Sequence, residues 1–227
     1  MSSTAAPSRR ERLRARTLAE IREHGLAQVA EGGQAALSLA GIAKEMGMSG
    51  PALYRYFASR DDLLLALIME SYEDFADTLT AIADRTRSDT PEERLRAVLN
   101  GTRQWALSQP HRYRLVFGSS YGPRPQARRA MDILLAALSE LEPVEQAATV
   151  SDSVLRNELA KWGDKSGRPP DDPRVLLMAL LTWTRVHGFI SVEIEGFFQH
   201  IGVDPARLYE AETDHLIAQL TGRFTPP

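Results

Sequence analysis

The sequence predicts an all-α protein of nine or ten helices. Three observations predict this class. The first two are that apolar residues recur at helical spacing through most of the chain and that helix-capping signals separate the runs. A third is that no stretch of any length has the alternating pattern of a strand. Apolar residues make up 43% of the 227 residues and charged residues 25%, which is enough to bury a core and excludes disorder as the main state.

Capping residues mark the helices in order. Ser8 and Glu11 have the spacing of a capping box, and Gly32-Gly33 ends the first helix. The later helices begin at hydroxyl or acidic N-caps or at N-terminal prolines. We expect these helices over about 38–46, 50–57, 59–75, 90–105, 110–117, 126–141, 153–162, 172–198 and 204–220. The helix at 172–198 is apolar nearly all round, so it must be covered on most sides.

Charge is distributed unevenly along the chain. Residues 1–60 hold nine Lys/Arg against five Asp/Glu, whereas residues 61–227 hold eighteen against twenty-five. Five arginines between Arg9 and Arg16 are accompanied by a single acidic residue, Glu11. This asymmetry favours a small nucleic-acid-binding part on a larger acidic body. The arginine stretch itself either contacts phosphates or is a solvated helix end.

Several classes of protein are excluded. The absence of cysteine excludes a disulfide scaffold, thiolate metal sites and thiol nucleophiles. No apolar run approaches the length needed to cross a bilayer, and the first residues lack the apolar stretch of a signal peptide, so we expect a cytoplasmic protein with no membrane partner. The five histidines are His24, His111, His187, His200 and His215, and their spacing is not that of metal ligands. We therefore expect neither a metal nor a cofactor.

The most specific segment covers residues 38–67. Two short helices joined by a turn at Gly47 and followed by a long helix are typical of a helix-turn-helix, whose second helix lies in the DNA major groove. Leu53 and Phe57, four residues apart, supply the inward face of that helix. Its outward face then carries side chains able to touch bases and phosphates: Ala52, Tyr54, Arg55 and Tyr56.

This segment resembles the DNA-binding domain of the TetR (tetracycline repressor) family. The resemblance rests on Leu53-Tyr54-Arg55-Tyr56-Phe57, followed by Ser59-Arg60-Asp61-Asp62-Leu63-Leu64, and it covers about residues 21–67. Trp183-Thr-Arg-Val-His187-Gly188 resembles the W-x-x-x-H-G signature of one family of TetR C-terminal domains. The resemblance implies a helix-turn-helix DNA-binding head over residues 1–67 and a ligand-binding and dimerisation body over residues 68–227.

The resemblance also implies a function and a set of contacts. The chain would be a homodimeric, sequence-specific transcriptional regulator, most often a repressor in that family, whose operator binding is controlled by a small effector and which needs no catalysis. Positions matching the family's groove-facing residues are Gly50, Pro51, Ala52, Tyr54 and Arg55. Positions matching its phosphate contacts are Ser38, Tyr56 and Arg60.

Large aromatic residues suggest an effector cavity in the body. It would lie between the helix at 95–105, the segment 113–117 and the long helix near the C-terminus, with walls from Trp105, Phe117, Trp183 and His187. The same residues could be plain core. No Lys or Arg cluster lies on these apolar stripes, so we expect an apolar effector. Glu193 and Glu195, among apolar neighbours, are interpreted as facing solvent.

Two other functions remain open. An all-α adaptor could use the same helices for protein contact. A serine hydrolase could use Ser120, because Gly118-Ser-Ser120-Tyr-Gly122 matches the G-x-S-x-G nucleophile elbow. That elbow needs a helix directly after it, and Pro123 and Pro125 oppose one, so this function is the least favoured.

Overall fold

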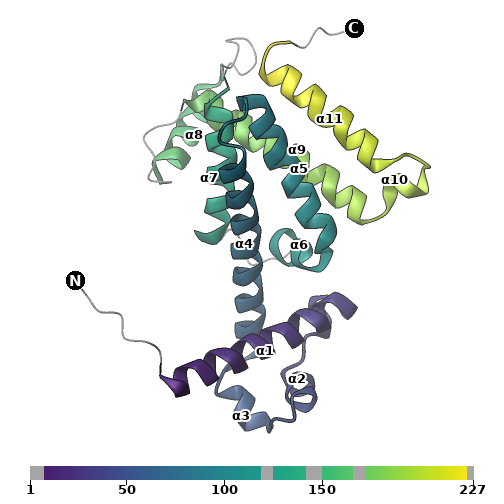
Figure 1. Cartoon of the computed structure of the whole chain (residues 1–227). Coiled ribbons are helices and arrows are strands. Elements are labelled where there is room, and N and C mark those ends of the chain that lie inside the picture. The colour runs from purple at the N-terminus through teal and green to yellow at the C-terminus, as the bar shows by residue number, and fades with distance from the viewer. Residues whose placement is uncertain (1–7, 119–124, 142–149, 166–171, 224–227) are drawn as a thin grey trace. The chain divides into compact units, whose positions relative to one another are not determined.

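The computed structural model describes residues 8–118, 125–141, 150–165 and 172–223, and over these ranges the regular structure is helical. They contain eleven α-helices, one short 3-10 helix and no strand (Figure 1), which confirms the all-α prediction. The contacts divide the chain into two compact units. The first comprises the residues up to Tyr72 together with Gln109–Gly122, and the second comprises Glu73–Ser108 and the residues from Pro123 onward.

The first unit holds the helix-turn-helix. Its elements are α1 (Arg9–Gly32), a 3-10 turn (Gln34–Ala36), α2 (Leu39–Glu45), α3 (Gly50–Tyr54), the first part of α4 (Arg60–Arg85) and α6 (Pro110–Phe117). The capping box predicted for α1 is present, because the Ser8 hydroxyl accepts from the Glu11 N–H at 3.2 Å and the Glu11 carboxylate accepts from the Ser8 N–H at 2.6 Å. Gly33, at φ 69°, ends the helix as expected.

A glycine inside α1 allows two helices of this unit to approach closely. A Cβ at Gly25 would lie 3.1 Å from Leu67 Cδ1 and 3.5 Å from both Leu63 Cδ2 and Leu37 Cδ1. Glycine costs about 1 kcal/mol relative to alanine in a helix interior. Packing of α1 against α4 therefore holds the segment helical.

The second unit is built around α9 (Pro173–Ile194). The later part of α4 belongs to it, with α5 (Pro91–Ser108), α7 (Pro125–Ser139), α8 (Ser153–Lys165), α10 (Phe197–His200) and α11 (Pro205–Leu220). Within this unit α9 contacts α5, α7, α8, α10 and α11. These neighbours cover part of α9, whereas Leu181, Gly188 and Val192 are exposed, so cover on most sides stays a prediction.

Two expectations about α9 are wrong. The helix ends at Ile194, not at residue 198, because Gly196 adopts φ 78° and starts the separate short helix α10. Also, α9 reaches the length and mean hydropathy, 1.5, of a membrane-spanning helix, although we expected no run near that length. Leu176, Ala179 and Ile190 of α9 are buried among its neighbours, but only 39% of the most apolar stretch of this helix is buried within the chain.

Candidate functional site

The motif helix α3 presents one face outward. Leu53 is fully buried and Phe57 nearly so, whereas Tyr54 is 54% exposed and Arg55 is exposed, which is the orientation expected from the spacing. The helix is shorter than expected and ends at Tyr54; the N–H groups of Tyr56 and Phe57 then donate to the Leu53 carbonyl in a closing turn. Between α2 and α3, Gly47 takes φ 64°, a backbone conformation that favours glycine.

Gln28 fixes the start of α2, a contact that the sequence did not indicate. Its side-chain oxygen accepts from the Ser38 N–H at 2.9 Å, and its amide nitrogen donates to Glu45 at 3.1 Å. His24 Nδ1 lies 2.9 Å from the other oxygen of Glu45. The Ser38 hydroxyl caps α2 by accepting from the Gly41 N–H at 3.2 Å, as predicted. Ser38 is thus exposed but held in place.

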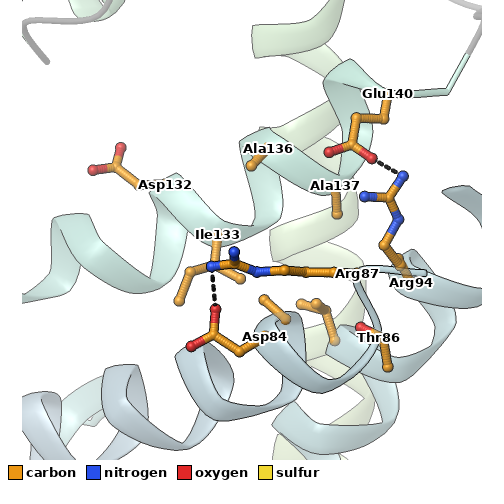
Figure 2. Close-up of a pocket in the computed structure, with 11 residues that line it drawn as sticks. Asp84, Thr86, Arg87, Arg94, Asp132, Ile133, Ala136, Ala137 and Glu140 are labelled. Carbon is orange, nitrogen blue, oxygen red and sulfur yellow. Dashed lines mark hydrogen bonds and ion pairs between the residues drawn. The ribbon is translucent and has the colours of Figure 1, made fainter. Parts of the chain in front are cut away.

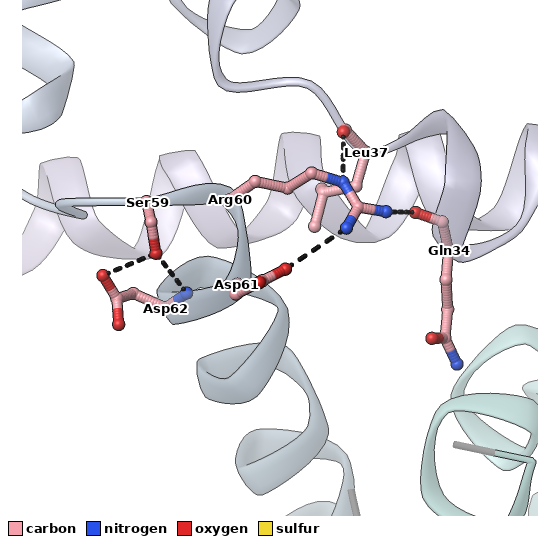
Figure 3. A network of polar contacts seen from close by, with 6 residues as sticks. All are labelled: Gln34, Leu37, Ser59, Arg60, Asp61 and Asp62. Carbon is pink, nitrogen blue, oxygen red and sulfur yellow. Dashed lines mark hydrogen bonds and ion pairs between the residues drawn. The ribbon is translucent and has the colours of Figure 1, made fainter. Parts of the chain in front are cut away.

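Arg60 ties the beginning of α4 to the segment between α1 and α2 (Figure 3). Its Nε donates to the Leu37 carbonyl at 3.0 Å, and its Nη2 donates to the Gln34 carbonyl. Its Nη1 donates to Oδ1 of Asp61 at 3.3 Å. Backbone carbonyls are not visible in a residue pattern, so no sequence signal could have found this role. A phosphate contact by Arg60 stays a prediction.

Three of the four residues expected at the effector cavity meet in one aromatic cluster of the second unit. Phe75 packs against both Trp105 and Trp183, with ring centroids 4.7 and 6.4 Å away. The ring centroid of His187 lies 4.2 Å from that of Trp183. Burial lowers the pKa of His187 to about 3. Trp105 also donates from Nε1 to Asp74 at 2.7 Å. The fourth residue, Phe117, belongs to the first unit and packs against Tyr72 and Tyr113.

A small apolar cavity adjoins this cluster between α4, α5, α7 and α9. Among the four expected residues, only Trp183 lines it. The cavity has room for about one water molecule. The Thr182 hydroxyl is buried beside it and, among the described residues, has no hydrogen-bond partner. The lining residues are Leu79, Val98, Leu99, Thr102, Ala130, Leu134, Thr182, Trp183 and Val186.

A larger pocket of about 280 Å³ opens between the end of α4, the start of α5 and α7. Figure 2 shows two ion pairs at its rim, Arg87 with Asp84 at 2.7 Å and Arg94 with Glu140. Its other lining residues are Ala83, Thr86, Val98, Asp132, Ile133, Ala136 and Ala137. None of the four expected residues lines it. The sequence analysis did not predict this pocket, because its wall is assembled from three helices.

The surface of α9 and α11 carries an exposed stripe of apolar and small side chains. Leu181 is 59% exposed, and Thr184, Gly188 and Val192 follow it at helical spacing. At Gly188, the place where a Cβ would stand faces open space, with no side chain or other helix of the described chain within 4 Å. On α11, which contacts α9, Leu208 and Ala211 are also exposed. Ser120, the nucleophile of the hydrolase alternative, lies outside the described residues.

Comparisons with known proteins agree with this arrangement. Residues 21–67 match the family model of bacterial regulatory proteins of the tetR family, and residues 95–216 match the tetracyclin repressor-like C-terminal domain. The HTH-type transcriptional regulators Rv1816 of Mycobacterium tuberculosis and Mb1846 of Mycobacterium bovis are each 32% identical to the chain over 97% of its length and 99% of theirs.

Solved structures are similar over most of the chain. A protein described as regulatory, SCO4313, has a TM-score of 0.75 and 38% identity and covers 93% of this chain and 98% of its own. The regulator FadR from Bacillus subtilis, solved with stearoyl-CoA, has a TM-score of 0.56 and 15% identity over 88% of this chain and 98% of its own. The second likeness is one of fold.

Proposed function

This chain belongs to the TetR family of bacterial regulatory proteins, and we propose that it is a dimeric repressor whose operator is released by a small apolar effector. It is a DNA-binding transcriptional regulator, as its relatives are. Regulators of this family bind DNA and small-molecule effectors, typically as dimers. We propose that it acts in the cytoplasm, with residues 1–67 as the DNA-binding head and residues 68–227 as the effector-binding body.

The observation that carries the DNA-binding role is the outward face of α3. Exposed Tyr54 and Arg55 are side chains that can read base edges while buried Leu53 anchors the helix. We propose that Gly50, Pro51 and Ala52 allow the N-terminal end of α3 to approach the bases. Phosphates would be bound by Ser38, Tyr56 and Arg60, which position the head without reading sequence.

Selection from a random-sequence duplex library tests this assignment. The purified protein should enrich a two-fold symmetric sequence, because a dimer with two heads binds two half-sites. Footprinting should then place α3 in the major groove of each half. Failure to enrich any sequence at moderate salt would contradict the repressor and favour the adaptor alternative.

We propose that the exposed stripe of α9 and α11 forms the dimer interface. Exposed apolar side chains on two helices in contact are typical of an association site, and an isologous interface would pair the two helices with their copies. Leu181→Glu combined with Leu208→Glu should give a monomer in sedimentation. Val154→Glu, on the exposed surface of α8, is the matched control and should remain dimeric. A wild-type monomer at micromolar concentration would contradict the proposal.

We propose that the effector enlarges the small cavity beside Trp183. The cavity lining is apolar apart from two threonines, and Thr182 offers a hydroxyl to a ligand. Val98 lines both this cavity and the larger pocket, so the seam between α5 and α7 is the proposed route inward. Opening the body would favour a head spacing that no longer matches two half-sites.

Tryptophan fluorescence with a panel of uncharged alkyl and aromatic compounds tests the effector site. Trp183→Ala and Thr182→Val should blunt the release of DNA by active compounds without changing DNA affinity in their absence. Val154→Ala, on the exposed surface of α8 and outside the cavity lining, is the control, and its release of DNA should match that of the wild type. Normal release by both cavity variants would contradict the location.

A further inference from the structure

The first two turns of α1 extend beyond the core of their unit. Every residue from 8 to 16 is exposed, including Leu13, whereas Ile21 and Gly25 further along the helix are buried. None of residues 8–16 has a buried side chain that anchors the turns in the core. The Ser8–Glu11 capping box stabilises these turns, since it satisfies N–H groups at the helix start.

The face of α1 that packs on the core continues past the edge of that core as arginines. Counting back from buried Ile21 in steps of three or four residues gives half-buried Thr17, then Arg14 and Arg10. The guanidinium of Arg14 lies 5.2 Å from the centroid of the Tyr56 ring, just after α3. Arg14, and Arg10 one turn before it, therefore lie on the α3 side of the helix.

These arginines are placed against the preference of the helix. A helix N-terminus carries partial positive charge, so cations in the first turns are unfavourable. The acidic residue within residues 8–16 is Glu11. Its carboxylate accepts from the Ser8 N–H, which lowers its pKa, and it is therefore engaged in the helix cap. Arg10 has no ion pair in the described part of the chain. The arrangement is costly unless an anion lies beyond the protein surface.

We propose that Arg10 and Arg14 bind backbone phosphates of the DNA that flanks the base pairs read by α3. This rests on the DNA-binding function proposed above and extends the binding surface outside the helix-turn-helix. The two residues are about 6 Å apart along the helix axis, so each can engage its own phosphate. Tyr56 holds the Arg14 guanidinium by a cation–π contact and leaves its N–H edge available.

The salt dependence of DNA binding separates this role from a general charge effect. Arg10→Gln with Arg14→Gln removes two charges from the α3 side, and Arg9→Gln with Arg12→Gln removes two from the opposite side of the same turns. Dissociation constants are measured between 50 and 300 mM KCl on the duplex most enriched from the random library, with 10 base pairs beyond each half-site. Two lost phosphate contacts should lower the slope of log K against log salt by about 2, whereas the control pair should leave it nearly unchanged.

A duplex trimmed to the half-sites completes the experiment. On the trimmed duplex, the salt slope of the wild-type protein should fall by about as much as the two substitutions lower it on the long duplex. The Arg10/Arg14 variant should bind the long and the trimmed duplex with the same affinity. Circular dichroism should give equal helix content for all three proteins. Equal loss in both variant pairs, or no loss in either, would overturn the inference while leaving specific binding intact. A wild type that retains no duplex even at 50 mM KCl would overturn the proposed DNA-binding function itself, and this inference with it.

Discussion

Arg103 and Glu193 form a two-pronged ion pair inside the second unit, at 2.8 Å from Nε to Oε2 and 2.5 Å from Nη2 to Oε1. Glu193 is only 7% exposed, so the interpretation that it faces solvent is wrong. The Arg103 guanidinium lies over the ring of Tyr209, whose hydroxyl donates to the Leu99 carbonyl at 2.7 Å. One partly buried arginine, whose side chain is 17% exposed, thus joins α5, α9 and α11, the helices of the proposed cavity and dimer interface.

Removing one partner of this pair should be much worse than removing both. Glu193→Leu leaves a largely buried guanidinium without its counter-ion, which costs about 3 kcal/mol because Arg103 keeps some contact with water, whereas Arg103→Met combined with Glu193→Leu should come close to wild-type stability. Urea unfolding of both variants gives the two free energies. A double variant as unstable as the single one would mean that the hydrogen-bonded geometry, not the isolated charge, is what matters.

Tyr54 and Leu53 should separate recognition from folding. Tyr54→Ala removes an exposed ring from the outer face of α3, so it should abolish sequence-specific binding and leave thermal stability within about 0.5 kcal/mol of wild type. Leu53→Ala empties a fully buried position and should destabilise the first unit by about 2–5 kcal/mol. Fluorescence anisotropy on the enriched duplex and thermal melts measure the two effects. The assigned facing is wrong if Tyr54→Ala unfolds the head.

Local signals made the helices of the first unit predictable. The Ser8–Glu11 box, the Ser38 cap and the turn at Gly47 each act within four residues, and the spacing of Leu53 and Phe57 is enough to orient α3. The fold class follows from the same signals, because helical periodicity needs no knowledge of tertiary contacts.

Contacts between distant residues were not predictable in the same way. Arg103 and Glu193 are ninety residues apart, and neither carries a local pattern that names its partner. Arg60 binds backbone carbonyls, which every residue has. The large aromatic residues indicated the cluster around Phe75, but cavity walls come from small residues such as Ala130 and Thr182, which composition does not single out.

Arg60→Ala should act on stability, whatever it does to DNA binding. The guanidinium holds the carbonyls of Leu37 and Gln34 against the start of α4, and loss of hydrogen bonds from a charged donor costs about 1.5–3 kcal/mol. Because the side chain is partly exposed, the lower end of that range is expected. Arg55→Ala, at an exposed arginine with no ion pair among the described residues, is the matched control. Equal melting temperatures for the two variants would show that the Arg60 contacts contribute nothing measurable.

His187 should make the second unit sensitive to mild acid. Burial lowers its pKa from the ordinary 6.5 to about 3, so the folded protein keeps it neutral while the unfolded chain takes up a proton below pH 6.5. Above pH 6.5 both states are neutral and the residue contributes no pH dependence. Between pH 6.5 and about 3 the unfolded state binds the extra proton, and the free energy of unfolding falls by about 1.4 kcal/mol per pH unit.

The comparison of wild type with His187→Gln isolates this contribution. From pH 7.5 to pH 5.0 the wild type should lose about 2 kcal/mol more stability than the variant, as measured by urea unfolding at both pH values. His111, whose pKa is also lowered by burial and by Arg112, is present in both proteins and cancels in the difference. Equal losses would mean that His187 is solvated or protonated in the folded state, which would also remove it as a neutral hydrogen-bonding group beside Trp183.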